Sequence, residues 1–214
     1  MPEPLSPAGD SAESAARTPW QDVPPGLSPF PRIADYAFLS DCNTTALVAP
    51  SGNVEWLCLP RIDSPSVFGS ILDRDAGGFR LGPDGVEVPA ARRYLPGTLV
   101  VETSWVVDGG GWIIVRDALL IGPWHHKAAR AERHKRTPAD YEAEHVLLRT
   151  VRCVNGEVQL VIDCHPVLDY GSTPAAWSHA GGGYEEVVAQ TDGLDHELRL
   201  TSDLQLGIEG SHVT

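Results

Sequence analysis

The stretch from Asp35 to Asp73 constrains the fold of this chain more than any other part of the sequence. It holds two apolar runs of β type, joined by the turn-forming sequence Pro50-Ser51-Gly52-Asn53. Strand alternation divides the second run between two faces, with Val54, Trp56 and Cys58 on one and Glu55, Leu57 and Leu59 on the other. Because both faces carry apolar side chains, this run is predicted to be an inner strand that is covered on two sides.

Later segments repeat the pattern of short strands and tight turns. Residues 98–107 alternate well and return after Asp108-Gly109-Gly110-Gly111 as residues 112–121, which predicts a hairpin. A second hairpin is predicted from residues 146–154 and 157–164, because Asn155-Gly156 between them suits a type I′ turn. No amphipathic helix longer than about three turns is indicated. The chain is therefore predicted to be all-β, with antiparallel strands in two packed sheets.

The first residues of the chain differ in composition from the rest. Residues 1–31 are rich in Pro, Ala, Ser and Glu, which predicts a disordered tail before a β-domain that spans residues 32–214.

The net charge of −13 argues against nucleic-acid binding, which needs a basic surface. No apolar run approaches the ~20 residues needed to cross a bilayer, and no basic region followed by an apolar one opens the chain. We therefore expect a cytoplasmic protein with neither membrane nor nucleic-acid partners.

The cysteine and histidine patterns indicate neither a redox motif nor a metal site. The four cysteines contain no C-x-x-C pair and are expected to be reduced and buried, whereas disulfides would indicate a secreted protein. His125-His126 and His134 have no carboxylate or cysteine at ligand spacing, so no metal site is predicted. Three tryptophans are expected to pack in the core: Trp105, Trp112 and Trp177.

Four ordered segments carry a family resemblance. The first contains D-C-x-T, A-L-V, W-L-C-L-P-R and D-S-P-S-V-F within residues 35–68. The others are Arg93–Thr98, Val115–Asp117 and Leu148–Gly171. Together they resemble the N-terminal β-domain of glycoside hydrolase family 15, which includes prokaryotic glucoamylases and actinobacterial trehalases. Gly122-Pro123-Trp124, after the third segment, resembles the trehalase branch more closely.

This resemblance implies a super-β-sandwich that precedes an (α/α)6 catalytic barrel. For the intact protein it implies inverting hydrolysis of α,α-trehalose to two glucose molecules, by two glutamates of that barrel. No segment here resembles the barrel motifs, so no catalytic residue is expected in this chain. The implied partners are the protein's own C-terminal barrel, a carbohydrate substrate and further copies in a homo-oligomer. Phosphate and magnesium are implied as cofactors of the full-length enzyme, and none is expected within this chain.

A polar cluster directly follows the inner strand and gives the best functional candidates. Arg61, Asp63 and Ser64 lie within four positions, and Trp56 precedes them. Arg61 and Asp63 are suited to a buried bidentate pair, and the cluster to hydrogen bonds with sugar hydroxyls while Trp56 offers a ring face. The plainer interpretation is that Asp63-Ser64-Pro65 form an Asx-type turn, which Arg61 ties down. Both interpretations stay open at this stage.

A basic segment interrupts the β pattern of this acidic chain. This segment is a candidate anion site, and phosphate, which the family resemblance implies as a cofactor, would be its ligand. The alternative is a solvated surface, which charge runs form more often. Its cations are Lys127, Arg130, Arg133, Lys135 and Arg136.

Two other functions remain open. One is a glucoamylase or glucodextranase of the same family, which acts on longer α-glucans. The other is a carbohydrate-binding module that is complete as it stands.

Overall fold

The computed structural model describes residues 30–121, 145–190 and 197–214. Its described residues from Pro31 onward belong to one compact unit built almost entirely of antiparallel strands. Two short helical turns interrupt the strands, η2 (Ile33–Asp35) and α1 (Leu168–Gly171). No helix in these residues combines the length and apolar character that a membrane crossing requires. The predicted tail and the basic segment fall almost wholly outside the described residues.

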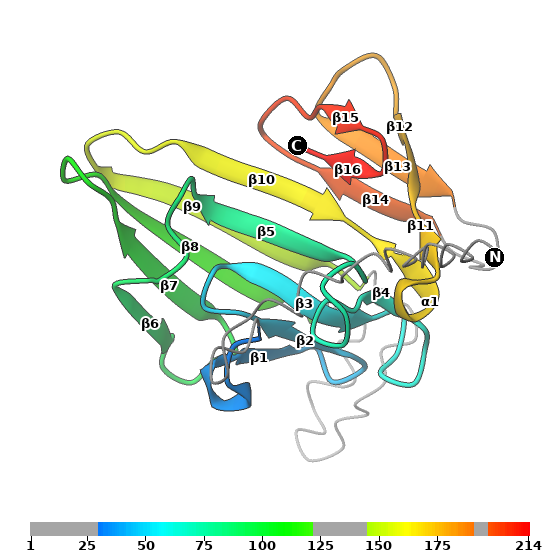
Figure 1. Ribbon diagram of the computed structural model, residues 1–214, viewed down its shortest axis with the longest axis horizontal. Helices are drawn as coiled ribbons and strands as arrows, with labels where there is room; N and C mark the ends of the chain where they lie inside the picture. Colours follow the sequence, from blue (N-terminus) through cyan, green and yellow to red (C-terminus); the bar gives the residue numbers. More distant parts are fainter. Residues whose placement is uncertain (1–29, 122–144, 191–196) are drawn as a thin grey trace, which may run out of the picture. The chain divides into compact units, whose positions relative to one another are not determined.

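The largest sheet contains eight strands in the order β1-β2-β3-β5-β10-β16-β15, with β4 paired to β3 (Figure 1). It is assembled from both ends of the unit, because β10 joins the N-terminal strands by pairing Leu160 with Pro83. Its strands are β1 (Ala37–Ser40), β2 (Thr45–Val48), β3 (Asn53–Cys58), β4 (Ser66–Phe68), β5 (Gly78–Pro83), β10 (Leu160–His165), β15 (Ile208–Glu209) and β16 (His212–Val213).

Two smaller sheets pack against the large one. The four-stranded sheet runs β6 (Ala91–Tyr94), β7 (Val101–Val106), β8 (Trp112–Leu119) and β9 (Leu147–Asn155). The three-stranded sheet runs β12 (Ala176–His179), β13 (Glu186–Gln190) and β14 (Leu198–Thr201). The two-residue strand β11 (Thr173–Pro174) lies just before β12 in the chain. The predicted all-β, antiparallel class is confirmed, although the strands form three sheets and not two.

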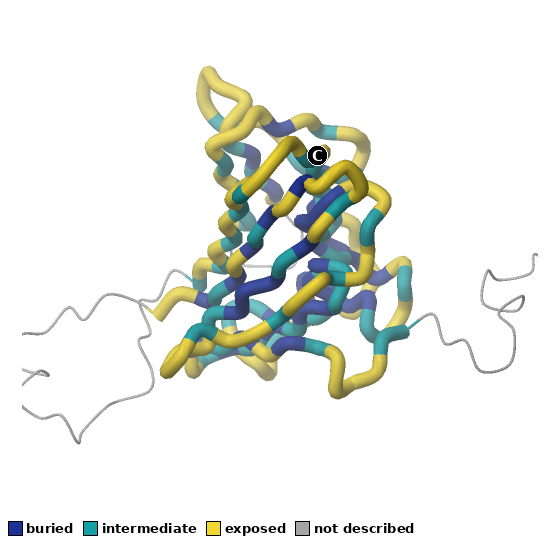
Figure 2. The backbone as a smooth tube through the Cα atoms, turned by 90° about the vertical axis from the view of Figure 1, so that its left-hand side faces the viewer, coloured by how far each residue is buried: buried dark blue, intermediate teal, exposed yellow. Residues whose placement is uncertain are grey.

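The apolar core lies where the sheets face one another, and Figure 2 shows the buried positions gathered there. One cluster joins the large sheet to both smaller ones, through residues such as Leu57, Leu119 and Val187. A second cluster surrounds Trp105, whose side chain is fully buried against Leu81 and Ile113. The inner-strand prediction for β3 is confirmed, because β3 pairs with β2, β4 and β5 and four of its six residues are buried.

The hairpin predicted across Asn155-Gly156 is wrong, whereas the one formed by β7 and β8 is confirmed. Strand β9 pairs with β8, and β10 leaves that sheet to pair with β5 and β16. Gly156 has a positive φ of 67°, as a tight turn requires, but the chain uses this turn to change sheets. A turn dipeptide specifies where the chain bends and not which strand the next segment joins. The apolar face of β10 decides that partner by covering the core.

Several predicted burial states also need correction. Trp105 is in the core and Trp177 packs against it, but Trp112 is 40% exposed on β8. All four cysteines are free; Cys58 and Cys164 are buried, whereas Cys42 and Cys153 are exposed. Burial raises the pKa of both buried thiols and so keeps them in the unreactive protonated form.

An ion pair buried between the layers ties the four-stranded sheet to the large one. Arg149 of β9 and Asp117 of β8 are opposite each other in register, with Nε and Oδ1 2.8 Å apart and side chains only 3% and 0% exposed. The same guanidinium donates to the carbonyl oxygens of Phe79 and Gly52, which belong to the facing layer. Its carbon also lies 4.7 Å from the centre of the Phe79 ring. Arg149 therefore links three segments that are far apart in sequence.

Candidate functional site

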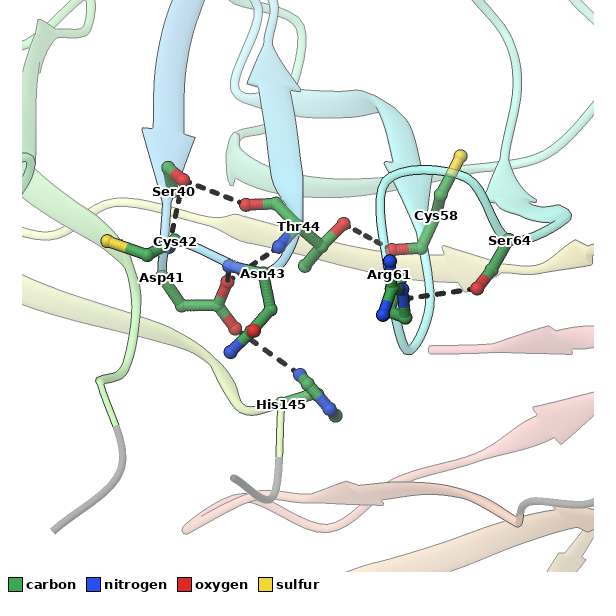
Figure 3. A network of polar contacts seen from close by, with 9 residues as sticks. All are labelled: Ser40, Asp41, Cys42, Asn43, Thr44, Cys58, Arg61, Ser64 and His145. Atoms are coloured by element: carbon green, nitrogen blue, oxygen red, sulfur yellow. Dashed lines mark hydrogen bonds and ion pairs between the residues drawn. The ribbon is translucent and has the colours of Figure 1, made fainter. Parts of the chain in front are cut away.

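The predicted loop after β3 lies against a second loop, between β1 and β2 (Figure 3). The Ile62 amide donates to the Asn43 carbonyl over 3.1 Å, so the two loops share a backbone hydrogen bond. The Thr44 hydroxyl donates to the Cys58 carbonyl over 2.5 Å at the end of β3. These contacts fix the position of the β3 loop relative to the first hairpin.

Asp41 organises the second loop. Its buried carboxylate accepts the amides of Asn43 and Thr44 through Oδ1, both at 2.8 Å, which forms an Asx-type turn. The other oxygen, Oδ2, lies 3.4 Å from Nδ1 of His145, at the start of the segment that leads into β9. Sequence reasoning missed this pair, because Asp41 and His145 are far apart in the chain and no local pattern links them.

Within the β3 loop, Arg61 and Ser64 hold each other. The Arg61 amide donates to the Ser64 hydroxyl over 3.1 Å, and the Ser64 amide donates to the Arg61 carbonyl over 3.0 Å. Arg61 Nε also donates to Asp63 Oδ1 over 3.0 Å, and this contact lowers the pKa of the Asp63 carboxyl. The two side chains are 63% and 69% exposed, so they do not form a buried bidentate pair, which was one of the two interpretations left open by the sequence. Ser64 closes the turn and leaves both charged groups facing solvent.

Trp56 is separate from this polar group. Its ring is partly buried in β3 and lies 6.4 Å from the ring of Tyr170, centre to centre, at an interplanar angle of 34°. Tyr170 belongs to α1, whose Asp169 and Tyr170 have positive φ. Of the four predicted residues, the structure thus brings together Arg61, Asp63 and Ser64, and gives Trp56 a partner on another element.

The β3 loop borders a large open cleft of about 1700 Å³. Both loops and the residues just before β9 contribute to its lining, through Asn43, Pro60, Arg61 and His145. Most of the remaining lining is apolar and comes from the facing sheets. The exposed polar group therefore stands beside an apolar surface that none of the described residues fills, an arrangement typical of a docking site.

Glu55 of β3 anchors a second polar group. Its nearly buried carboxylate accepts the Tyr36 hydroxyl at 2.5 Å and Nη1 of Arg74 at 2.7 Å. Burial, together with the Glu55 contact, raises the pKa of Tyr36 to about 12 from 10.0. These contacts join η2, β3 and the segment after β4, which makes Glu55 a structural residue.

The raised pKa of Tyr36 predicts a stability loss in alkali. The folded state favours the neutral phenol, so the contribution is complete below pH 10 and disappears as the pH rises from 10 towards 12. A phenolate absorbance titration should show one of the five tyrosines ionising last, and Tyr36→Phe should remove that late step. Ionisation of all tyrosines together near pH 10 would contradict this prediction.

The buried carboxylates of the described residues already have partners and do not form an acid–base pair. Glu55 contacts Tyr36 and Arg74, and Asp117 contacts Arg149. Glu102 is held by Arg93 and Arg116, which lower the pKa of its carboxyl. A glycosidase general acid needs a raised pKa, so this shift has the wrong direction. Within the described ranges no cluster of three His, Cys, Asp or Glu suited to a metal is found, and the candidate anion site lies outside them.

Comparison with known proteins identifies the domain. Residues 27–108 match the family model described as "Trehalase-like, N-terminal". The trehalase of Mycolicibacterium smegmatis is 57% identical over 198 residues, which cover 91% of this chain and 30% of that protein. The chain contains a trehalase-like N-terminal domain. The trehalase of Mycobacterium tuberculosis is also 57% identical to it, over 87% of this chain and 28% of the relative.

The similarity to trehalases extends beyond mycobacteria. The trehalase of Thermoplasma volcanium is 38% identical over 144 residues, or 66% of this chain and 21% of the relative. The chain thus spans at most about 30% of the length of these curated relatives. No solved structure matches the chain significantly.

Proposed function

We propose that this chain is the non-catalytic N-terminal β-domain of an α,α-trehalase. The observation that carries the proposal is its 57% identity, over most of its length, to two proteins named trehalase. The full-length protein would hydrolyse trehalose to two glucose molecules. Because the chain corresponds to less than a third of these relatives, the catalytic domain is assigned to the remaining part.

The proposed chemistry is hydrolysis with inversion. It requires one protonated carboxyl to donate to the glycosidic oxygen and one carboxylate to activate water, about 6.5–9.5 Å apart. Three of the buried carboxylates described above, Glu55, Glu102 and Asp117, are held by arginines, and Asp41 is held by backbone amides and His145, which supports placing the catalytic pair elsewhere. An (α/α)6 barrel of family 15, its phosphate and magnesium dependence and a cytoplasmic location all stay predictions.

The domain's own role is to pack on the catalytic domain and border its active-site mouth. The geometry that supports this role is the exposed Arg61–Asp63 pair on a loop fixed by backbone hydrogen bonds. A fixed loop with exposed hydrogen-bonding groups suits a substrate-facing edge. Homo-oligomer contacts through this domain are also proposed.

The test of this function is an assay of the full-length protein on trehalose and on maltose. We expect trehalose to be cleaved preferentially, and the isolated 214-residue chain to cleave neither sugar. Faster cleavage of maltose or longer α-glucans would instead assign a glucoamylase-type enzyme. Tight glycan binding by the isolated chain would favour a stand-alone carbohydrate-binding module.

Arg61→Ala tests the loop in the full-length protein. Its ion pair is exposed and screened by solvent, so the substitution should change the unfolding free energy little. Turnover of trehalose should nevertheless fall, because the loop loses the group that faces the substrate edge. Arg93→Ala is the matched control, since Arg93 is also exposed and ion-paired but lies on β6. Equal rates for the two variants would remove Arg61 from the site.

A further inference from the structure

The apolar cleft is walled by two strands that end their sheets. β9 is the last strand of the four-stranded sheet and β14 the last of the three-stranded sheet, and neither has a second partner strand among the described residues (Figure 1). Consecutive residues of each strand line the cleft, residues 145–151 of one and 197–204 of the other. Consecutive lining residues indicate that the strands present their backbone edges, because a sheet face would contribute alternate residues.

The hydrogen-bond pattern gives the direction of these edges. The Leu120 amide donates to the Val146 carbonyl, so alternation turns the backbone groups of Leu147, Arg149 and Val151 away from β8. On the other wall, the Ser202 amide donates to the Glu185 carbonyl of the β13 side. By alternation, the backbone amides and carbonyls of Arg199 and Thr201 point away from β13. Both walls therefore offer amides and carbonyls to an added strand.

The floor of the cleft is the apolar face of the large sheet. Alternate residues of β5 and β10 form it, as expected for a sheet seen from one side. Ile162 packs against both core clusters. The floor residues are Phe79, Leu81, Leu160, Ile162 and Cys164. Such a floor suits apolar side chains and not sugar hydroxyls.

We propose that this cleft receives an extended strand from the later part of the same polypeptide, which joins the β9 and β14 edges and makes the two smaller sheets continuous. The proposal rests on the proposed function, because the longer trehalase relatives supply the additional chain. The edge from residue 145 to residue 153 is about 25 Å long, enough for a strand of eight residues or so. The strand would turn alternate apolar side chains onto Ile162 and its neighbours.

A second copy of the folded domain fits this cleft less well. The edge of a folded sheet carries its neighbouring strands with it, and these would have to enter a cleft that has strands on both sides. An isolated domain with unpaired strand edges beside an apolar surface tends to associate with other chains through those edges. The continuation of the chain is therefore the favoured occupant.

Backbone amide exchange tests the proposal in the 214-residue chain and in the full-length polypeptide. In the short chain, the outward amides of β9 and β14 should exchange as open edges, and a dye for apolar surface should bind. In the full-length protein, these amides should exchange about 100-fold more slowly. The outward edge of β12 should change little and serves as the internal reference.

Thr201→Pro is the test variant, because it removes a backbone amide of β14 that points into the cleft. His179→Pro is its control, because it removes an outward amide on the opposite edge of the same sheet. The Ala180 amide donates to the Glu186 carbonyl, so by alternation the His179 amide points away from β13. Thr201→Pro should lower the Tm of the full-length protein more than His179→Pro, whereas the two should act alike in the short chain.

Three results would overturn the proposal. Protected β9 and β14 amides in the monomeric short chain would mean that its own residues fill the cleft. Protection that rises with concentration, together with dimers in ultracentrifugation, would assign a second copy. Open amides in the full-length protein would leave the cleft unfilled. Trehalose cleavage is measured separately, so an inactive full-length protein with protected edges would reject only the proposed function.

Discussion

Replacing Arg149 by leucine is expected to remove about 3–5 kcal/mol of unfolding free energy, the cost of leaving one partner of a buried ion pair alone. The carboxylate of Asp117 is fully buried, and its second oxygen, Oδ2, already has no hydrogen-bond partner among the described residues. The substitution also takes a donor from the carbonyls of Phe79 and Gly52. Since whole domains are stable by about 5–15 kcal/mol, urea unfolding should show a large shift in midpoint.

A double variant separates charge from packing at this position. Arg149→Met combined with Asp117→Leu removes both charges and keeps apolar volume, so it should recover most of the lost stability. Arg93→Ala provides the comparison: the Arg93 side chain is exposed and its buried partner Glu102 keeps Arg116, so this substitution should cost less than Arg149→Leu. If Arg149→Leu cost no more than Arg93→Ala, the buried pair would not be what links the two layers.

Gly52→Ala is expected to destabilise the protein by about 3 kcal/mol or more, through backbone strain and a direct clash. Gly52 has a φ of +82°, and a Cβ there would lie 2.4 Å from the Leu81 carbonyl oxygen and 3.2 Å from the ring of Trp105. Neither neighbour can move easily, because one is backbone within β5 and the other is a fully buried ring.

Gly110→Ala is the matched control for Gly52→Ala. Gly110 has a φ of +86°, but a Cβ there meets nothing within 4 Å. Its cost should be the conformational one alone, about 1–2 kcal/mol. Thermal or urea unfolding gives the stability loss of each variant, and the loss for Gly52→Ala minus that for Gly110→Ala is the cost of the clash with Leu81 and Trp105. Equal losses would show that these contacts relax without cost.

Local patterns in the sequence predicted the strands better than their partners. The two-sided apolar character of residues 54–59 correctly indicated the inner strand β3, and the glycine-rich turn at residues 108–111 correctly indicated the β7–β8 hairpin. The pairing of β10 with β5 could not be predicted in this way, because strand neighbours distant in sequence are chosen by core packing. The third sheet, β12-β13-β14, pairs within itself and was not separated from the other strands by any sequence pattern.

The candidate site shows the same division. Arg61, Asp63 and Ser64 were found together because they are neighbours in sequence, and the structure keeps them in one turn. The contacts that place this turn, Ile62 to Asn43 and Asp41 to His145, come from other loops. The buried state of Asp41 gives no sequence signal, because an aspartate before Cys42-Asn43 looks like any turn former.

The late arrival of β10 has a consequence for synthesis of the protein on the ribosome. The strands β1 to β5 can pair as soon as they emerge, but the free side of β5 must wait for residue 160 and beyond. In the meantime β6 to β9 are made and can only pair with one another. A pause in translation before residue 160 would therefore leave β5 open to foreign strands, and nascent chains held there should recruit chaperones more strongly than longer nascent chains in which β10 has emerged.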